Sequence, residues 1–230
     1  MDLVPELLGR VGAAYEAHRD PVAAGPMSRY MRGQFPFLGI PRPQRDPLDR
    51  DVLAGLRAPD ESELTGVVSA LWDRDEREYQ YFALRYLRAH ARRCSAGLIQ
   101  VLEGLVTTKS WWDTVDELAQ GSVGPLVRTH PDLLGTMDAW ATGPQLWLAR
   151  AAILHQLAAR TDTDVERLFR HCLANAASTE FFLRKAIGWA LRQYSKTDPV
   201  AVERFVEAYR AELSGLSRKE ALKVIERARG

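Results

Sequence analysis

The segment LWLARAAILHQL (residues 146–157) spaces its apolar side chains as one face of an α-helix does. Pro144 comes just before it, at a position where a new helix can begin, because proline is tolerated in a first helical turn but not in the interior. Comparable spacing recurs along most of the chain, whereas the alternation typical of strands is nearly absent. The sequence therefore predicts an all-α fold.

Segments related to this one recur at a regular interval. RAAIL at Arg150 aligns with KAIGW at Lys185 and EALKV at Glu220, each 35 residues further along. A step of 34 back from Arg150 reaches Asp116, and a further 35 reaches Tyr81. Each interval has room for two helices. Its length is a little shorter than the roughly 40 residues of a HEAT repeat. We predict one domain over residues 1–230, an α-solenoid superhelix of HEAT-like helical repeats whose second helices line a concave surface. An irregular bundle with accidental spacing is the alternative.

Local signals suggest where individual helices begin. Thr163 with Glu166, and Ser217 with Glu220, fit capping boxes, in which two side chains satisfy amides of the first turn. Pro131 and Pro199, like Pro144, also mark expected helix starts.

Residues 20–48 have a different composition, with six prolines and three glycines. Proline interrupts helices, so any helix here should be short, with Met27–Arg32 forming one or two turns at most. The apolar run FPFLGI (35–40) is too hydrophobic for a flexible linker. We predict an irregular segment that crosses the domain.

Composition excludes several classes of protein. A hydrophobic content of 46% and a charged content of 27% describe an ordinary globular chain, and no run of eighteen apolar residues suggests a membrane span. The N-terminal MDLVPELLGR lacks the basic lead of a secretory signal. Cys94 and Cys172 offer neither a disulfide framework nor the spacing of a zinc site. We expect a cytoplasmic protein with two reduced thiols and no metal site.

Charge is distributed unevenly along the chain. The net charge is +1, but residues 181–230 carry a net +5 and residues 1–180 a net −4. A basic C-terminal part could contact phosphate, although an asymmetry of this size is weak evidence by itself.

The predicted register places an unusual set of side chains on one groove. Asp116, Arg150 and Lys185 occupy equivalent positions, Trp112 lies one turn before Asp116, and Trp189 lies one turn after Lys185. Cations and aromatic rings suit nucleic acid. A carboxylate repels phosphate, so its presence needs a reason, and stabilising the positive sugar formed when an N-glycosidic bond breaks is one. The competing interpretation is an Asp116–Arg150 ion pair joining two helices, with tryptophans that only pack.

Five segments carry a resemblance to a known family. They are PMSRYMRGQFPFLGI (26–40), LWDRDEREYQ (71–80), TKSWWDTVD (108–116), LWLARAAILHQL (146–157) and FFLRKAIGWALRQYSKT (181–197). In this order and at these separations, the chain resembles the DNA alkylation repair family of AlkD-type glycosylases over most of its length.

The resemblance implies a monomeric DNA glycosylase, acting in the cytoplasm on nucleoid DNA. Such an enzyme hydrolyses the N-glycosidic bond of cationic N3- and N7-alkylated purines, including 3-methyladenine and 7-methylguanine, in double-stranded DNA held in a basic concave groove. It uses no metal or organic cofactor, leaves the base in the helix and needs no protein partner. A non-enzymatic α-solenoid that binds damaged DNA or a partner protein is the alternative.

Carried over position by position, the resemblance assigns roles to residues of this chain. The catalytic residues would be Asp116, Trp112, Trp189 and Arg150, with Asp116 stabilising the sugar and Arg150 holding a phosphate while keeping Asp116 ionised. Tyr30 matches the tyrosine of the family's RYM motif. Charge and register add further candidates for contact with DNA: Lys109, Lys185, Arg192, Lys196, Arg218 and Lys219.

Overall fold

The structure, a computed structural model, describes residues 2–229, and within that range all regular structure is helical, with no strand. The all-α prediction is therefore confirmed. The contacts divide the chain into two compact units, one ending at Ser95 and the other beginning at Ala96. The expectation of a single domain over residues 1–230 stays a prediction. No helix among these residues has the length and apolar character needed to cross a membrane.

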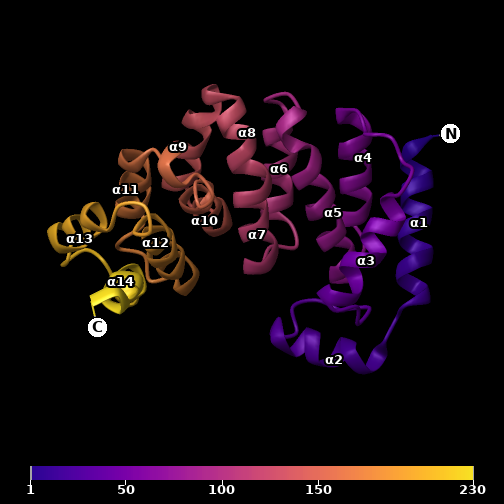
Figure 1. The fold of residues 1–230 in the computed structure, drawn as a ribbon, viewed down its shortest axis with the longest axis horizontal. Helices are drawn as coiled ribbons and strands as arrows, with labels where there is room; N and C mark the ends of the chain where they lie inside the picture. Colours follow the sequence, from indigo (N-terminus) through magenta and orange to yellow (C-terminus); the bar gives the residue numbers. More distant parts are fainter. Residues whose placement is uncertain (1, 230) are drawn as a thin grey trace. The chain divides into compact units, whose positions relative to one another are not determined.

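Unit 1 is built around four packed helices and one that stands apart. Helix α1 contacts α3 and α4, and α4 contacts α5. Helix α2 buries none of its residues and runs across the end of α1 and α3 (Figure 1). The elements are α1 (Leu3–Ala17), α2 (Pro21–Tyr30), α3 (Arg42–Leu53), α4 (Glu61–Trp72), α5 (Arg77–His90) and the short 3₁₀ helix η1 (Ala91–Arg93).

The expectation of short helices in residues 20–48 was wrong. Helices of 10 and 12 residues, α2 and α3, form there. Each begins with a proline in its first turn, at Pro21 and Pro43, where the missing amide hydrogen costs nothing. Each also tolerates one proline further in, at Pro26 and Pro47. The irregular crossing is confined to residues 31–41.

A buried carboxylate fixes that irregular crossing. Glu78, on α5, accepts hydrogen bonds from the backbone amides of Leu38, Gly39 and Ile40 at 2.9 to 3.0 Å. Gly39 has a φ of +92°, and a Cβ there would lie 1.9 Å from the carbonyl oxygen of Asp20. Only glycine fits this approach, so the apolar run 35–40 is anchored in the unit and is not a linker.

Unit 2 stacks helix pairs in two layers. The first helices, α9, α11 and α13, lie on one side and the second helices, α10, α12 and α14, on the other (Figure 1). Helix α10 contacts both α7 and α12, and α12 contacts α14. The α-helices are α6 (Leu98–Thr107), α7 (Trp112–Leu118), α8 (Gly124–Thr129), α9 (Leu134–Thr142), α10 (Leu146–Leu154), α11 (Val165–Ala174), α12 (Phe181–Tyr194), α13 (Pro199–Ala208) and α14 (Gly215–Arg229). The 3₁₀ helices are η3 (Pro131–Leu133) and η4 (Arg160–Asp162).

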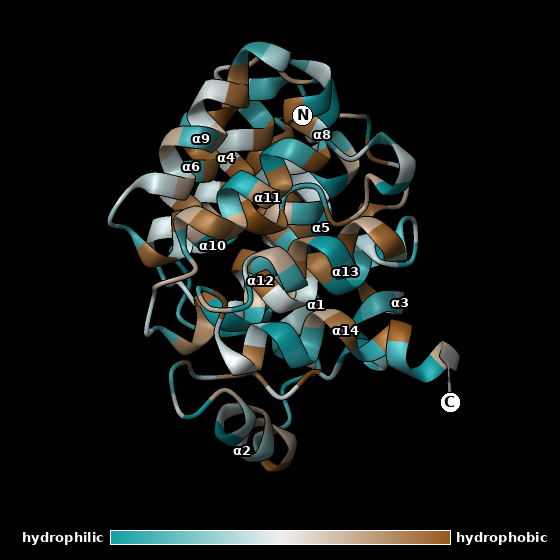
Figure 2. Ribbon diagram, turned by 90° about the vertical axis from the view of Figure 1, so that its left-hand side faces the viewer, coloured by the Kyte–Doolittle hydropathy of each residue, from teal (hydrophilic) through white to brown (hydrophobic). Residues whose placement is uncertain are grey.

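The 35-residue period corresponds to this stacking. Asp116, Arg150, Lys185 and Glu220 lie on α7, α10, α12 and α14, the successive members of one layer. Apolar and polar residues alternate around these helices (Figure 2), as amphipathic packing requires. The prediction of helical repeats is confirmed for this unit.

Two of the predicted helix caps were wrong. Asp164, not Thr163, caps α11, because its carboxylate accepts the amide hydrogen of Arg167. Helix α14 begins before Ser217, whose own amide donates to the hydroxyl of Ser214. Ser217 instead donates from its hydroxyl to the carbonyl of Arg184, which ties α14 to α12.

Helices α7 and α8 are parts of one helix interrupted by a π-helical turn, η2 (Ala119–Val123). The extra residue of a π turn rotates the helical segment before it relative to the segment after it. Gly124 lies directly after the turn, where an added Cβ would come within 2.0 Å of the carbonyl oxygen of His155. The π turn therefore ends where this helix meets the end of α10 backbone to backbone.

Candidate active site

Asp116 and Arg150 meet in unit 2 as the period predicts. Asp116 Oδ1 accepts from Arg150 Nε at 2.7 Å, and Oδ2 accepts from Nη2 at 2.8 Å. The Asp116 side chain keeps 11% of its surface exposed and that of Arg150 only 5%. Two parallel, charge-assisted bonds fix the carboxylate plane, and the carboxylate is the more accessible partner.

Arg150 also reaches the next repeat. Its Nη1 donates to the carbonyl oxygen of Phe182, in the first turn of α12. One guanidinium therefore links α7, α10 and α12. Three of its five N–H groups are used inside the protein, so the structure supports a role in positioning Asp116 more directly than the expected contact with phosphate.

Burial raises the pKa of the Asp116 carboxyl above its usual value, and the guanidinium of Arg150 opposes that rise. We expected the pKa to be lowered by Arg150. The direction is reversed because Asp116 is so thoroughly removed from water that desolvation outweighs the attraction.

Three aromatic rings form a cluster that reaches the ion pair through Phe182. Trp111 caps α7, Trp147 and Phe182 lie in the first turns of α10 and α12, and their ring centroids are 5.0 to 5.9 Å apart. The Arg150 guanidinium carbon lies 5.9 Å from the Phe182 centroid. Phe182 thus contacts Arg150 both through its ring and through its backbone carbonyl. Phe182 was not among the predicted residues, because its contribution is a backbone carbonyl and a ring, which sequence does not distinguish from core packing.

Trp112 is the first residue of α7, half-buried and one turn before Asp116. Four residues beyond Asp116, Gln120 lies on η2. At a rise of 1.5 Å per residue, Gln120 follows Asp116 by about 6 Å along the helix. Gln120 was also missed, since an isolated glutamine carries no recognisable signal.

Trp189 lies two turns beyond Phe182 on the same face of α12. It lines a hollow of about 510 Å³ together with Gln120, Gln193 and residues 157–162. Gln120, four residues beyond Asp116, is therefore part of the hollow that Trp189 lines. Both predicted tryptophans lie in unit 2.

Several predicted DNA contacts are occupied within the protein. Glu220 accepts from Lys185 Nζ at 3.0 Å and from Arg192 Nη1, and these cations lower the pKa of its carboxyl. Arg218 donates to the carbonyls of Arg210 and Leu213, and Lys196 to Gln193.

The remaining predicted contacts differ in setting. Lys219 is exposed on α14. Lys109 has a positive φ of 49° in the loop before α7. Tyr30 ends α2 in unit 1, with 70% of its surface exposed. Within residues 2–229, no group of three or more His, Cys, Asp or Glu side chains gathers as metal ligands would. Cys94 and Cys172 are both buried thiols.

Comparison with known proteins identifies relatives. The sequence model described as DNA alkylation repair enzyme matches residues 11–225. A structure described as a predicted DNA alkylation repair enzyme from Enterococcus faecalis has 33% identity and a TM-score of 0.82, covering 89% of this chain and 95% of that one.

The crystal structure of AlkD2 from Streptococcus mutans has 16% identity and a TM-score of 0.61, covering 76% of this chain and 87% of that one. At that identity the similarity concerns the fold alone. No curated protein matches the chain. From the extent of the match over residues 11–225 and the likeness to the Enterococcus faecalis structure, the chain belongs to the DNA alkylation repair enzyme family.

Proposed function

We propose that this protein is a monofunctional alkylpurine DNA glycosylase. Its substrates would be cationic N3- and N7-alkylated purines in double-stranded DNA. In the reaction, the bond between C1′ and the purine nitrogen breaks and its electron pair goes to the base, which leaves uncharged. Water bonds to C1′ and releases a proton to solvent. The products are a free purine and an abasic site.

The observation that carries the proposal is the nearly enclosed carboxylate of Asp116. Both of its oxygens are held by Arg150, yet each retains a lone pair, and the side chain remains partly exposed. A cationic base needs no general acid, so only the positive charge developing on the sugar requires stabilisation. A fixed carboxylate in a water-poor setting provides it without reorganising during the reaction.

Trp112 and Trp189 support the same assignment. Both side chains are half-buried. Trp112 lies one turn before Asp116 on α7, and Trp189 lies on α12, the helix whose Phe182 contacts Arg150. Their rings would pack against deoxyribose and attract its developing charge, a weak form of cation–π interaction. Contact with the sugar from the backbone side leaves the lesion stacked in the duplex. The protein would act as a cytoplasmic monomer on chromosomal DNA.

The direct test is release of the base. We expect the purified protein to liberate 7-methylguanine and 3-methyladenine from methylated duplex DNA, with abasic sites appearing in equal number. Because the proposed chemistry uses only side chains, the rate in EDTA should equal the rate without it. Chromatography of the free bases and alkaline cleavage of the strand measure both products.

Two results would contradict the proposal. Binding of damaged duplex without release of base would assign the chain to a sensor of damage. Failure to bind any duplex would favour a helical-repeat scaffold for a protein partner. In either case the Asp116–Arg150 pair would be a structural link between α7 and α10.

A further inference from the structure

The hollow beside Trp189 contains chemistry that the proposed reaction does not use. Its volume of about 510 Å³ exceeds what one tryptophan face needs. Polar side chains from three elements line it: Gln120 from η2, Arg160, Thr161 and Asp162 from η4, and Gln193 from α12. Polar side chains beside one aromatic ring are the composition expected of a surface that binds a ligand, whereas a packing defect would be lined by apolar groups.

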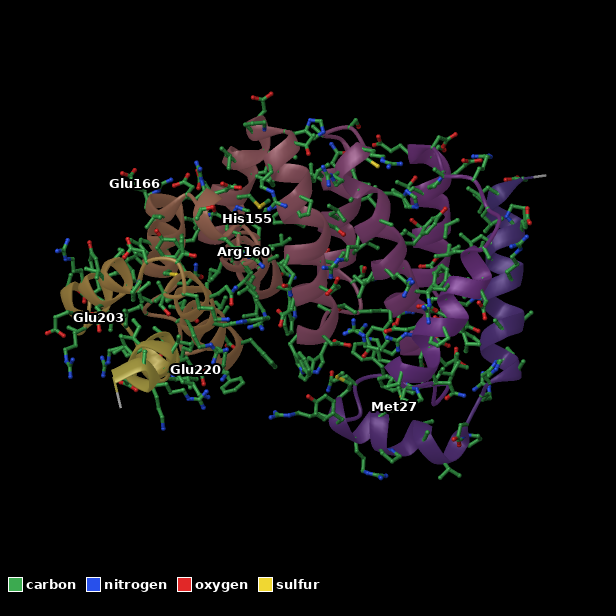
Figure 3. All side chains as sticks on the ribbon, in the orientation of Figure 1. Met27, His155, Arg160, Glu166, Glu203 and Glu220 are labelled. Carbon is green, nitrogen blue, oxygen red and sulfur yellow. The ribbon has the colours of Figure 1, made fainter. Side chains whose placement is uncertain are left out.

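Arg160 is the cation of this hollow, and its charge is available. Its side chain is exposed, and in the described part of the chain no ion pair or side-chain hydrogen bond engages it. Lys185 and Arg192, by contrast, share the carboxylate of Glu220. In Figure 3, Arg160 and Glu220 lie on the side of the second helices, whereas Glu166 and Glu203 lie over α11 and α13.

Arg160 is also held in an unfavourable backbone conformation. Its φ is +55°, in the left-handed region that residues other than Gly, Asn and Asp rarely adopt. Among residues 2–229, the non-glycine residues with positive φ are Arg32, Lys109 and Arg160, all of them basic. Glycine would satisfy this turn better than arginine, so the presence of arginine points to a use for the guanidinium.

We propose that the hollow binds one phosphodiester of the DNA strand, adjacent to the sugar that contacts Trp189, and that Arg160 holds its non-bridging oxygens. This inference rests on the proposed function. The planar fork of a guanidinium matches two phosphate oxygens, and the amides of Gln120 and Gln193 can donate to the same group. Asp162, on the same turn, repels an anion, so the hollow is tuned against general accumulation of phosphate.

Arg160 and Asp162 carry opposite charges on one turn, so removing each charge should change the affinity for DNA in opposite directions. Arg160→Gln should weaken binding of unmodified duplex about tenfold, the scale of one charged hydrogen-bonded contact. The slope of log Kd against log salt should lose about 0.9 as one phosphate contact disappears. Asp162→Asn should tighten binding. Arg170→Gln removes the same charge from the exposed face of α11 and serves as the matched control, with affinity unchanged.

Arg160→Gly separates the charge from the fold. Glycine adopts a φ of +55° without strain, so this variant should keep or raise the melting temperature and still bind DNA about tenfold more weakly. An unchanged affinity and salt slope for Arg160→Gln and Arg160→Gly would overturn the assignment, even where the unaltered protein releases 7-methylguanine normally. If the unaltered protein neither binds duplex nor releases base, the proposed function fails, and the phosphate site fails with it.

Discussion

At the scale of single residues, the central feature is a carboxylate with two possible roles. Asp116 could act on a sugar, or it could only join α7 to α10 through Arg150. Another ion pair of unit 2 between layer neighbours, Asp138 with Arg167, joins α9 to α11 and offers a structural comparison. The two roles predict different consequences when the charge is removed.

We expect Asp116→Asn to slow base release by roughly ten- to a thousandfold, or about 1.4 to 4 kcal/mol, because one electrostatic stabiliser of the transition state is lost. Affinity for intact duplex should hold or improve, since a negative charge leaves a surface that meets phosphates. Single-turnover excision and a binding titration measure the two effects.

Asp138→Asn is the control, because it removes the same charge from an ion pair between α9 and α11, away from the candidate site. It should lower the melting temperature without changing the single-turnover rate. If Asp116→Asn behaves like this control, Asp116 has no part in the chemistry.

His155 predicts how stability depends on pH. Only 3% of its surface is exposed, its Nδ1 bonds the carbonyl of Ala152, and burial lowers its pKa from 6.5 to about 4. As pH falls from 6.5 towards 4, the unfolded chain gains a proton at this residue that the folded protein does not. The free energy of unfolding should therefore drop by about 3 kcal/mol over that interval from this group.

Urea unfolding at pH 7 and pH 4.5 measures that drop. His155→Gln keeps a donor but cannot titrate, so its unfolding free energy should change less between the two pH values. Equal losses in the unaltered protein and in His155→Gln would show that burial does not shift the pKa of His155.

At the scale of helices, the sequence predicted those features that depend on spacing. A charged residue recurs at the equivalent position of each repeat because that position lies where neighbouring helices touch. Two ion pairs form between these residues, Asp116–Arg150 and Lys185–Glu220. The 35-residue period therefore reflects contacts between helices. Both the fold class and the Asp116–Arg150 pair could be predicted from it.

Features that depend on local conformation could not be predicted in this way. Composition alone suggested that α2 and α3 would be broken, yet proline position within each helix decided the outcome. The caps were misplaced because Asp164 and Ser214 were available next to the chosen residues. Arg160 lacks a motif, and its place in the hollow depends on the turn at residues 157–162.

Replacing two glycines of unit 2 by alanine should change the free energy of unfolding in opposite directions. Gly124→Ala would place a methyl group 2.0 Å from the His155 carbonyl oxygen, so α8 and α10 must separate. We expect a loss of about 1 to 3 kcal/mol or more. Gly135→Ala in α9 meets nothing within 4 Å and should add about 0.5 to 1 kcal/mol. Urea denaturation measures both, and a tolerated Gly124→Ala would mean that the two helix ends are not in close contact.

At the scale of the whole molecule, charge should govern association. The net charge is only +1, and Glu220 already neutralises part of the basic surface of residues 181–230. Binding must then depend on a few placed cations. We expect log Kd for duplex DNA to vary with log salt at about 0.9 per neutralised phosphate, with a total of several phosphates. Affinity measured from low to moderate salt tests this, and a slope near zero would exclude a DNA-binding surface.

The π turn between α7 and α8 has a consequence for recognising active relatives. One extra residue turns the segment before it by about 100° relative to the segment after it, so the direction of Asp116 is set independently of the buried Leu126 and Val127. A relative shorter by one residue between these positions could keep its core, its aspartate and its tryptophans, and still direct the carboxylate elsewhere. Assigning activity by homology therefore requires counting the gap from Asp116 to Leu126 as well as matching the residues.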